Sequence, residues 1–568
     1  MQRLPFGRRA SPAPTLRHLV AALALASAIP AGMAAGVASK VPPGRVEEPT
    51  IDITINEHDT LIALARDRFV SPRAWREIAK LNRLPDPSRI YPGQVLRVPE
   101  RLLRSQPVAA RLVSAVGDVR VADATAQSGS DVAEGQRIET GNDGSAVIEL
   151  ADGSRMRLAP SSLAELSASR SYAPASTDAT GTNGWFSGAM RVLRGSVEVF
   201  ATKVLRAKPL EVTTPTAVAG VRGTHYRVDY AEADSQASRA GVLEGRVRLD
   251  TADRRKGADL DAGYGGAIDA SAAAPTAIAL PGPPDLDALP ERFERPIVRF
   301  TLAGETAPVR VQIAEDPAFD RIVRDLQAAP GAEFRITGLP DSAWYLRARR
   351  VGEQGIEGVD ATHPFVLKAR PEPPVPSRPR ADGKVSAGSV EFAWAQNAAA
   401  PQARLQVADD DAFTHIVADV DPIDAANRVV ALETPGVYHW RLASIRPDGD
   451  HGPFGDPLHF EVRPQAPAPT GGVAGDGKSL IFHLGGRPQD HQLVQLARDV
   501  EFKNVVTEQE LASADWSLPL PAEGGRYYFR YRVKEPDGFI GDYTAPLVVD
   551  VPVDRSYLWL LAPLLLLL

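Results

Sequence analysis

No cysteine occurs anywhere in the 568 residues of the chain. Disulfides, thiol nucleophiles and lipid-modified cysteines are therefore all excluded. Hydrophobic residues make up 44% of the composition, which over this length is enough for several separate cores. A chain of this length is expected to contain about four domains, and here they must be stabilised without covalent cross-links.

Long runs of one charge are also missing. The net charge is −7, both signs are interspersed, and no long basic run follows residue 20. A nucleic-acid partner is therefore not expected. The ten histidines form no H-E-x-x-H pair or close cluster, and no G-x-S-x-G elbow occurs. We therefore expect no metal, no cofactor and no enzymatic activity.

One segment, residues 472–479, has the spacing of a phosphate-binding P-loop. A phosphate cradle of this type needs a strand before the loop and a helix after it. Here a proline-rich stretch precedes the glycines, and residues 480–484 have the character of a strand. We therefore interpret the segment as a turn.

The first 38 residues have the pattern of an export signal. Arginines precede an apolar run at 19–29, and small-residue sites follow at 26–28 and 36–38. Arg8-Arg9 leaves a twin-arginine route open, but the residues after the pair lack the apolar pattern of that route, which favours ordinary secretion. The mature protein is therefore expected outside the cytoplasm, in the periplasm or associated with the cell envelope.

Residues 51–99 combine short strands with two helical patterns. Isoleucines alternate from 51 to 55 as in a strand, two stretches of helical periodicity follow, and residues 95–98 form a last strand. Asp59 is suited to cap the first helix. The predicted order is βααβ.

This unit resembles a LysM module, through Asp59-Thr60-Leu61, Asn82, residues 90–96 and Val98-Pro99. The resemblance implies a groove between the loop before the first helix and the loop after the second. It also implies a ligand built of N-acetylglucosamine units, as in peptidoglycan or chitin-like glycans. By position, the glycan-binding residues would be Asp59, Thr60, Leu61, Asn82, Ile90 and Tyr91.

His58 departs from the family pattern, which usually has glycine at that position. If the backbone needs a positive φ there, a histidine is strained. Several of the candidate residues also have a structural interpretation, which stays open beside the functional one: Asp59 as a helix cap, Asn82 as a helix end and Tyr91 as a core residue.

Between residues 107 and 270 the helical signal disappears. Short alternating runs recur between glycines or Asp-Gly pairs, which predicts an all-β domain. Within it, residues 213–228 form a strand-turn-strand signal rich in small residues, and this indicates a structural corner.

Residues 213–228 closely resemble the signature of FecR-type domains, and further segments between 117 and 247 follow the order of that family. FecR-type regulators receive a signal in the periplasm, so the resemblance also implies an envelope protein as a partner. The departures at His225-Tyr226 and Gly263-Tyr264 are expected at the surface. The signature residues are Thr214, Pro215, Ala219, Val221, Arg222, Gly223 and Thr224.

From residue 285 onward the chain contains three copies of one pattern. In each copy a glutamine is followed by an aspartate four residues later, a phenylalanine seven later and an arginine thirty-five later. The residues are Gln312, Asp316, Phe319 and Arg347; Gln406, Asp410, Phe413 and Arg441; and Gln495, Asp499, Phe502 and Arg530.

Units of roughly 90 residues built from short strands are typical of β-sandwiches. The three copies resemble fibronectin type III-like or immunoglobulin-like modules, and we expect them to cover residues 285–368, 380–463 and 470–553. Proline-rich connectors separate them, and few contacts are expected to cross the joints.

The last twelve residues, 557–568, are almost entirely apolar. As a helix they would extend about 18 Å, against roughly 30 Å of bilayer hydrocarbon, and Pro563 interrupts them. The segment is therefore too short to span a membrane as it stands, but it could dip into one or dock on a partner.

These patterns predict a multidomain, mainly β protein with a LysM-like module, a FecR-like domain and three β-sandwiches. The favoured function is a non-catalytic envelope protein that binds peptidoglycan and presents its other domains as a scaffold or ligand-sensing surface. The alternative is a component of a FecR-type signal relay, although the sequence shows no transmembrane segment or cytoplasmic part for one. A wall hydrolase is not favoured, because no catalytic domain is recognised.

Overall fold

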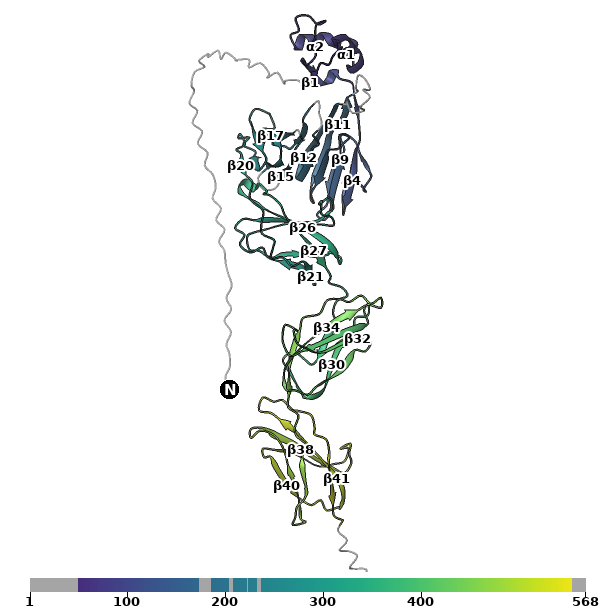
Figure 1. The fold of residues 1–568 in the computed structure, drawn as a ribbon, viewed down its shortest axis with the longest axis vertical. Coiled ribbons are helices and arrows are strands. Elements are labelled where there is room, and N and C mark those ends of the chain that lie inside the picture. The colour runs from purple at the N-terminus through teal and green to yellow at the C-terminus, as the bar shows by residue number, and fades with distance from the viewer. Residues whose placement is uncertain (1–49, 173–184, 204–207, 222, 232–235, 554–568) are drawn as a thin grey trace, which may run out of the picture. The chain divides into compact units, whose positions relative to one another are not determined.

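The computed structural model describes residues 50–172, 185–203, 208–221, 223–231 and 236–553 (Figure 1). The predicted export signal, the apolar tail and Arg222 lie outside these residues. The predicted fold class is confirmed, because strands predominate and both α-helices of the described part lie before residue 82.

The N-terminal module has the predicted βααβ order, and its two strands pair with each other. Alternation along the first strand turns Ile51 and Ile53 inward, and Ile55 follows them, each at most 1% exposed. They pack with the apolar faces of both helices in one small core. The elements are β1 (Thr50–Thr54), α1 (Leu61–Arg68), the 3-10 helix η1 (Pro72–Ala74), α2 (Trp75–Leu81), β2 (Val95–Pro99) and the 3-10 helix η2 (Glu100–Leu102).

The central β-domain is built on one long strand, β12 (Trp185–Phe200). The first part of β12 pairs with β11 and β13 in one sheet, and its last part pairs with β10 and β15 in a second sheet. Both sheets contribute to a single hydrophobic core. The strand β12 therefore ties the two sheets together.

The other strands of the central β-domain are β3 (Ser105–Pro107), β4 (Ala110–Val116), β5 (Val119–Val121), β6 (Ala124–Thr125), β7 (Asp131–Val132), β8 (Arg137–Thr140), β9 (Ser145–Glu149), β10 (Arg155–Leu158), β11 (Leu163–Tyr172), β13 (Leu210–Thr213), β14 (Ala217–Val221), β15 (His225–Ala231), β16 (Ala237–Glu244), β17 (Arg246–Thr251), β18 (Gly257–Asp261), β19 (Tyr264–Ile268) and β20 (Ile278–Ala279).

Three β-sandwiches follow, each with two sheets around its own core. The first contains β21 (Arg292–Phe293), β22 (Val298–Phe300), β23 (Val309–Ala314), β24 (Ile322–Ala328), β25 (Phe334–Ile336), β26 (Ser342–Arg350), the 3-10 helix η3 (Glu353–Gly355) and β27 (Ala361–Leu367). The second contains β28 (Val375–Arg378), β29 (Gly383–Ser386), β30 (Gly388–Ala395), β31 (Gln402–Ala408), β32 (Ile416–Ile423), β33 (Asn427–Leu432), β34 (Gly436–Ile445) and β35 (Leu458–Arg463). The third contains β36 (Thr470–Val473), β37 (Ser479–His483), β38 (His491–Ala497), β39 (Val505–Leu511), β40 (Asp515–Pro519), β41 (Gly525–Lys534) and β42 (Leu547–Val551).

The segment with P-loop spacing is the turn of the β36–β37 hairpin. Gly477 N donates to Ala474 O at 2.9 Å, and Lys478 N donates to the side chain of Asp476 at 2.9 Å. The chain continues as a strand and not as a helix, so the segment has the conformation that the sequence indicated.

The repeated residues form the same cluster in every sandwich. Arg347 donates two hydrogen bonds to Gln312 Oε1, at 3.0 and 2.6 Å, and its guanidinium lies 4.6 Å from the centre of the Phe319 ring. Equivalent contacts recur for Arg441 with Gln406 and Phe413, and for Arg530 with Gln495 and Phe502. The sequence repeat is therefore a repeat of packed polar contacts.

Candidate functional site

The loop before α1 and the loop before β2 lie next to each other. Ile55 N donates to Gln94 O, and Gly93 N donates to Ile55 O, both at 2.8 Å. These hydrogen bonds continue the pairing of β1 with β2 into the loops. They bring residues 56–60 and 90–93 to the same end of the module, as the predicted groove requires.

Asp59 and Thr60 shape the first loop. Asp59 Oδ2 accepts a hydrogen bond from Asn56 N at 2.9 Å, and Thr60 Oγ1 accepts one from Ala63 N at 3.1 Å. The N-cap of α1 is therefore Thr60, and the prediction that Asp59 caps the helix is wrong by one residue. Asp59 is half-buried and Thr60 is exposed, so a ligand can reach both.

Leu61 and Asn82 are engaged within the protein. The side chain of Leu61 is 2% exposed and belongs to the core. Asn82 Nδ2 donates to Ile78 O at 2.9 Å and to Arg97 O at 2.7 Å, and Asn82 Oδ1 accepts from Arg97 N at 2.7 Å. Asn82 thus fastens the end of α2 to β2, and this structural role uses both of its amide hydrogens.

Tyr91 is 63% exposed, so the interpretation of this residue as part of the core is wrong. Its backbone is held in a turn, because Tyr91 N donates to Gln94 Oε1 and Tyr91 O accepts from Gln94 N, both at 3.0 Å. Ile90 is half-buried against the core. Sequence reasoning missed Ile62, which is 65% exposed in the first turn of α1. The sequence could have indicated Ile62, because it is an apolar residue outside the buried face of α1.

His58 has a φ of 70°, in the left-handed region. The backbone thus adopts the conformation for which glycine is usual at this position, and the histidine is strained as expected. The loop geometry is therefore maintained although the side chain disfavours it.

The described residues of the FecR signature form a packed corner. Thr214 Oγ1 accepts from Ala217 N at 2.9 Å and closes the turn between β13 and β14. A Cβ atom on Gly223, whose φ is +68°, would lie 2.7 Å from Lys203 Cγ. Thr214, Ala219, Val221 and Thr224 are at most 7% exposed, whereas Pro215 is exposed. These contacts make the corner structural.

The departure from the family at His225-Tyr226 is not a surface feature, so that expectation was wrong. Tyr226 is fully buried. His225 stacks on Phe200, with ring centres 4.2 Å apart, and its Nε2 lies 2.9 Å from Glu198 Oε1. The pair therefore borders a buried carboxylate.

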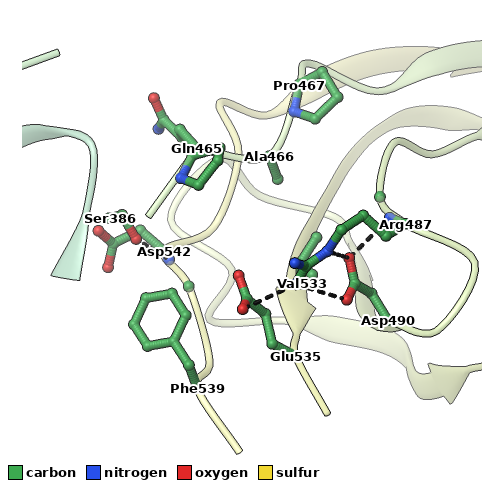
Figure 2. A pocket seen from close by; sticks show the side chains of 13 residues that line it. Ser386, Gln465, Ala466, Pro467, Arg487, Asp490, Val533, Glu535, Phe539 and Asp542 are labelled. Atoms are coloured by element: carbon green, nitrogen blue, oxygen red, sulfur yellow. Dashed lines mark hydrogen bonds and ion pairs between the residues drawn. The ribbon is translucent and has the colours of Figure 1, made fainter. Parts of the chain in front are cut away.

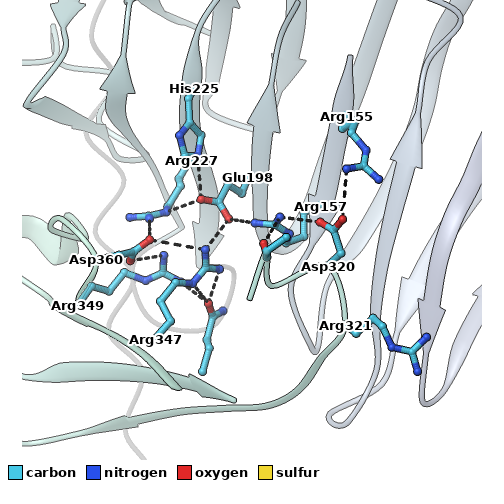
Figure 3. Close-up of polar contacts among 12 residues, drawn as sticks. Arg155, Arg157, Glu198, His225, Arg227, Asp320, Arg321, Arg347, Arg349 and Asp360 are labelled. Atoms are coloured by element: carbon cyan, nitrogen blue, oxygen red, sulfur yellow. Dashed lines mark hydrogen bonds and ion pairs between the residues drawn. The ribbon is translucent and has the colours of Figure 1, made fainter. Parts of the chain in front are cut away.

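Glu198, at the end of β12, is the centre of a buried charge network that sequence reasoning missed (Figure 3). Arg157 and Arg227 of the central β-domain approach its carboxylate at 2.6 and 3.3 Å. Arg347 of the first sandwich approaches it at 3.1 Å. Asp360 of the first sandwich in turn pairs with Arg227. The repeated arginine of the first copy is thus also a contact between two domains.

Opposing effects set the charge of Glu198. Burial alone would raise its pKa, but the positive charges of Arg347 and Arg227, together with His225 and Arg157, hold the pKa of this carboxyl well below its usual range. Glu198 is therefore ionised, and the network is held together by charge.

Asp229 lies nearby on β15 and behaves differently. Burial raises the pKa of Asp229 to about 6; Arg239 opposes this shift at 2.9 Å, and the negative charge of Glu357 adds to it. The pKa of Glu198 therefore lies below the usual range and that of Asp229 above it, because the arginines around Glu198 outweigh its burial, whereas burial outweighs the effect of Arg239 on Asp229.

A cavity of about 170 Å³ lies where residues of the second and third sandwiches meet (Figure 2). Three charged residues of its lining pair with one another, because Arg487 contacts Glu535 at 2.9 Å and Asp490 at 3.2 Å. Across the same joint, Arg463 pairs with Asp537 at 3.1 Å.

Comparison with protein families finds two domains. The family described as LysM domain matches residues 53–99, and the family described as FecR protein matches residues 136–248. Both domains that the sequence motifs indicated are therefore present. Comparison with curated proteins gave no match.

Two kinds of solved structure are similar to parts of the chain. One is a candidate anti-sigma factor from Parabacteroides distasonis ATCC 8503, with 16% identity and a TM-score of 0.19; the similarity covers 25% of this chain and 59% of that one. The other is the FN1-FN3 region of chicken CNTN1, with 12% identity and a TM-score of 0.21, covering 48% of this chain and 99% of that one.

Proposed function

We propose that the protein is a non-catalytic envelope protein that binds peptidoglycan, or a related N-acetylglucosamine glycan, through its N-terminal module. The central β-domain and the sandwiches present a scaffold or ligand-sensing surface. The proposal is supported by two adjoining loops, joined by the hydrogen bonds of Ile55 with Gly93 and Gln94, in a module that the LysM family matches. One loop contains Asp59 and Thr60, and the other contains Ile90 and Tyr91.

The chemistry of these loops suits a sugar. Asp59 and Thr60 offer oxygen acceptors at the start of α1, and the exposed ring of Tyr91 offers a flat apolar surface. Glycans need both, because their hydroxyls and acetamides form hydrogen bonds while their ring faces are apolar. Leu61 and Asn82 support the loops from behind.

Export to the periplasm or envelope is part of the proposal and rests on the N-terminal sequence pattern. In the described part of the chain, neither helix reaches the length and apolar character that a membrane crossing requires.

The test is retention of the purified protein on insoluble peptidoglycan. Replacing Asp59 and Tyr91 together by Ala is expected to weaken retention about two- to tenfold, because a lost hydrogen bond costs about 0.5–1.5 kcal/mol. Chito-oligosaccharides are expected to compete with the wall for the wild type. The matched control replaces Arg76 and Lys80, which are exposed on α2, and is expected to bind like the wild type.

Point substitutions are preferable to deletion of the module. Tyr172 of β11 is 2% exposed and packs in the core of the N-terminal module, and its hydroxyl donates to Glu100 at 2.5 Å. Removing residues 51–99 would therefore expose part of the central β-domain. Undiminished retention by a folded double variant would contradict glycan binding at these loops.

A second candidate is a role in a FecR-type signal relay, supported by the match of the FecR family to residues 136–248. In that case the ligand of the central β-domain is an envelope protein. Its binding is expected to be unaffected by the Asp59 and Tyr91 substitutions, which separates the two functions in one set of variants.

A further inference from the structure

The third sandwich places two arginines where the first sandwich uses two arginines to hold carboxylates. The three copies align without a gap over the segments 347–360, 441–454 and 530–543. Equivalent backbone hydrogen bonds fix this register: Gly358 N to Arg350 O at 2.8 Å, Gly452 N to Ser444 O at 2.8 Å and Gly541 N to Val533 O at 2.9 Å.

In the first sandwich both arginines are saturated with acidic partners. Arg347 Nη1 donates to Glu198 Oε2 of the central β-domain at 3.1 Å. Arg349 contacts Glu357 at 2.9 Å and Asp360 at 3.3 Å. The two arginines are 6% and 3% exposed. This face is therefore a docking surface with complementary charge.

In the third sandwich the arginines are retained and the acids are not. Arg530 and Arg532 stand at the positions of Arg347 and Arg349, whereas Tyr543 replaces Asp360. At the position of Glu357 the third copy has Ile540. Neither arginine forms an ion pair with any of the residues in the described ranges, and both are only partly buried.

Aromatic rings hold the two arginines in place. The Arg530 guanidinium lies 3.8 Å from the centre of the Phe502 ring and 4.0 Å from that of Tyr543, and Arg532 lies 4.5 Å from the Tyr543 ring. Arg530 also donates twice to Gln495 Oε1, as its counterpart does in the first copy. These contacts use Nε and Nη2 of Arg530, so its Nη1 remains for a carboxylate.

The second sandwich lacks this arrangement. Arg441 lies between the rings of Phe413 and Phe454, but the second arginine is replaced by Ala443. Burial and the positive charge of Arg404 lower the pKa of Arg441, while the negative charges of Glu294 and Asp419 oppose that shift. Among the described sandwiches, the third is therefore the one that has two arginines at these positions without an acidic partner.

We propose that this face of the third sandwich, formed by Arg530, Arg532 and Tyr543, is an interaction surface for a partner protein that presents a glutamate or aspartate from a β-strand. The first copy supplies the precedent, because the acid it receives is Glu198 on β12. Arg347 makes that contact through Nη1, and Arg530, whose Nε and Nη2 bind Gln495 in the same way, has its Nη1 at the equivalent position for a charge-assisted hydrogen bond. This interaction goes beyond glycan binding and does not depend on it.

The test uses the full chain with ¹⁵N-labelled arginine and two nine-residue peptides. One peptide has the sequence of residues 194–202, with Glu198 at its centre, and the other is identical except for Glu198→Gln. The Nε–H signals of Arg530 and Arg532, assigned with Arg530→Lys and Arg532→Lys variants, are expected to shift with the glutamate peptide. The affinity of the glutamine peptide is expected to be lower by a factor of about five or more.

Two substitutions at Tyr543 provide matched controls. Tyr543→Asp gives the third copy the internal acid of the first, so it is expected to occupy the arginines and abolish the shifts. Tyr543→Phe copies the aromatic residue of the second sandwich and is expected to retain them. The signals of Arg347, whose acid is already in place, are expected not to move.

The comparison of the two peptides on the wild type does not depend on how a variant folds. Equal shifts with both peptides, or no shift of Arg530 and Arg532 with the glutamate peptide, would overturn the proposal. So would full binding by Tyr543→Asp. Shifts caused by phosphatidylglycerol vesicles but not by the glutamate peptide would assign the surface to a membrane instead.

Discussion

Arg347 of the first sandwich donates a hydrogen bond to Glu198 of the central β-domain at 3.1 Å, although 149 positions separate them in the sequence. The exposed fractions of the two side chains are 7% and 6%. A carboxylate removed from water costs several kcal/mol unless paired, and here arginines from two domains share it. The contact therefore depends on both domains being present.

Replacing Glu198 by Gln is expected to lower the free energy of unfolding by about 3–5 kcal/mol, because it leaves buried arginines without their acid. Urea denaturation followed by circular dichroism measures the change. The control is Asp261→Asn, which removes an exposed partner of Arg246 and is expected to cost less than about 1 kcal/mol. Similar losses in the two variants would show that the network contributes little.

Stability is expected to depend on pH through Asp229. The groups that face it are Arg239, Glu357 and Arg310. Its pKa in the folded protein is about 6, above the value of about 3.9 in an unfolded chain. The folded state thus binds the proton more tightly, so the stabilisation is full below about pH 4 and is lost as the pH rises through 6.

This dependence is measured as a difference between the wild type and Asp229→Asn. Between pH 4.5 and 7.5 the free energy of unfolding of the wild type, relative to the variant, is expected to fall by about 2 kcal/mol. Groups such as Glu198 titrate in both proteins and largely cancel. A difference that stays constant over this range would contradict the assignment to Asp229.

His58→Gly is expected to stabilise the N-terminal module by about 0.5–1 kcal/mol, because glycine adopts a φ of 70° without strain. Hydrogen exchange of residues 50–104 reports the effect. As a control, Arg76→Gly inside α2 is expected to destabilise the module by about 1 kcal/mol. Destabilisation by His58→Gly would mean that the imidazole makes a contact worth more than the strain.

The joints between the sandwiches are expected to be cut first by proteases. Contacts that cross them, such as Lys368 with Asp450 at 2.7 Å, are partly exposed and weakened by salt, unlike the buried network around Glu198. Limited proteolysis should therefore cleave within 371–379 and 464–469 before it cleaves within 270–285, and faster in 1 M salt. Earlier cleavage at 270–285 would contradict this order.

Local patterns predicted much of the fold. Alternating isoleucines gave β1, the turn residues gave the β36–β37 hairpin, and the repeat register identified the residues that later proved to be in contact, such as Gln312 and Arg347. These predictions are correct because periodicity and turn chemistry are local properties of the chain.

The candidate site was predicted less completely. Whether Asp59 or Thr60 caps α1 depends on the residue at which the helix begins, and the backbone becomes helical only after Thr60. The role of Asn82 depends on Arg97, fifteen residues away, and the role of Asp360 depends on Arg227, an arginine in another domain. Such pairings are made by tertiary structure, so no periodicity along the chain encodes them.

Phe319, Phe413 and Phe502 share a positive φ, at 61°, 55° and 55°. This conformation disfavours phenylalanine, yet all three sandwiches keep it at equivalent positions. The three sandwiches therefore share one strained turn that holds a phenylalanine against an arginine. Asp360, Phe454 and Tyr543 differ at equivalent positions beside that turn, so one architecture gives the arginine a different neighbour in each copy.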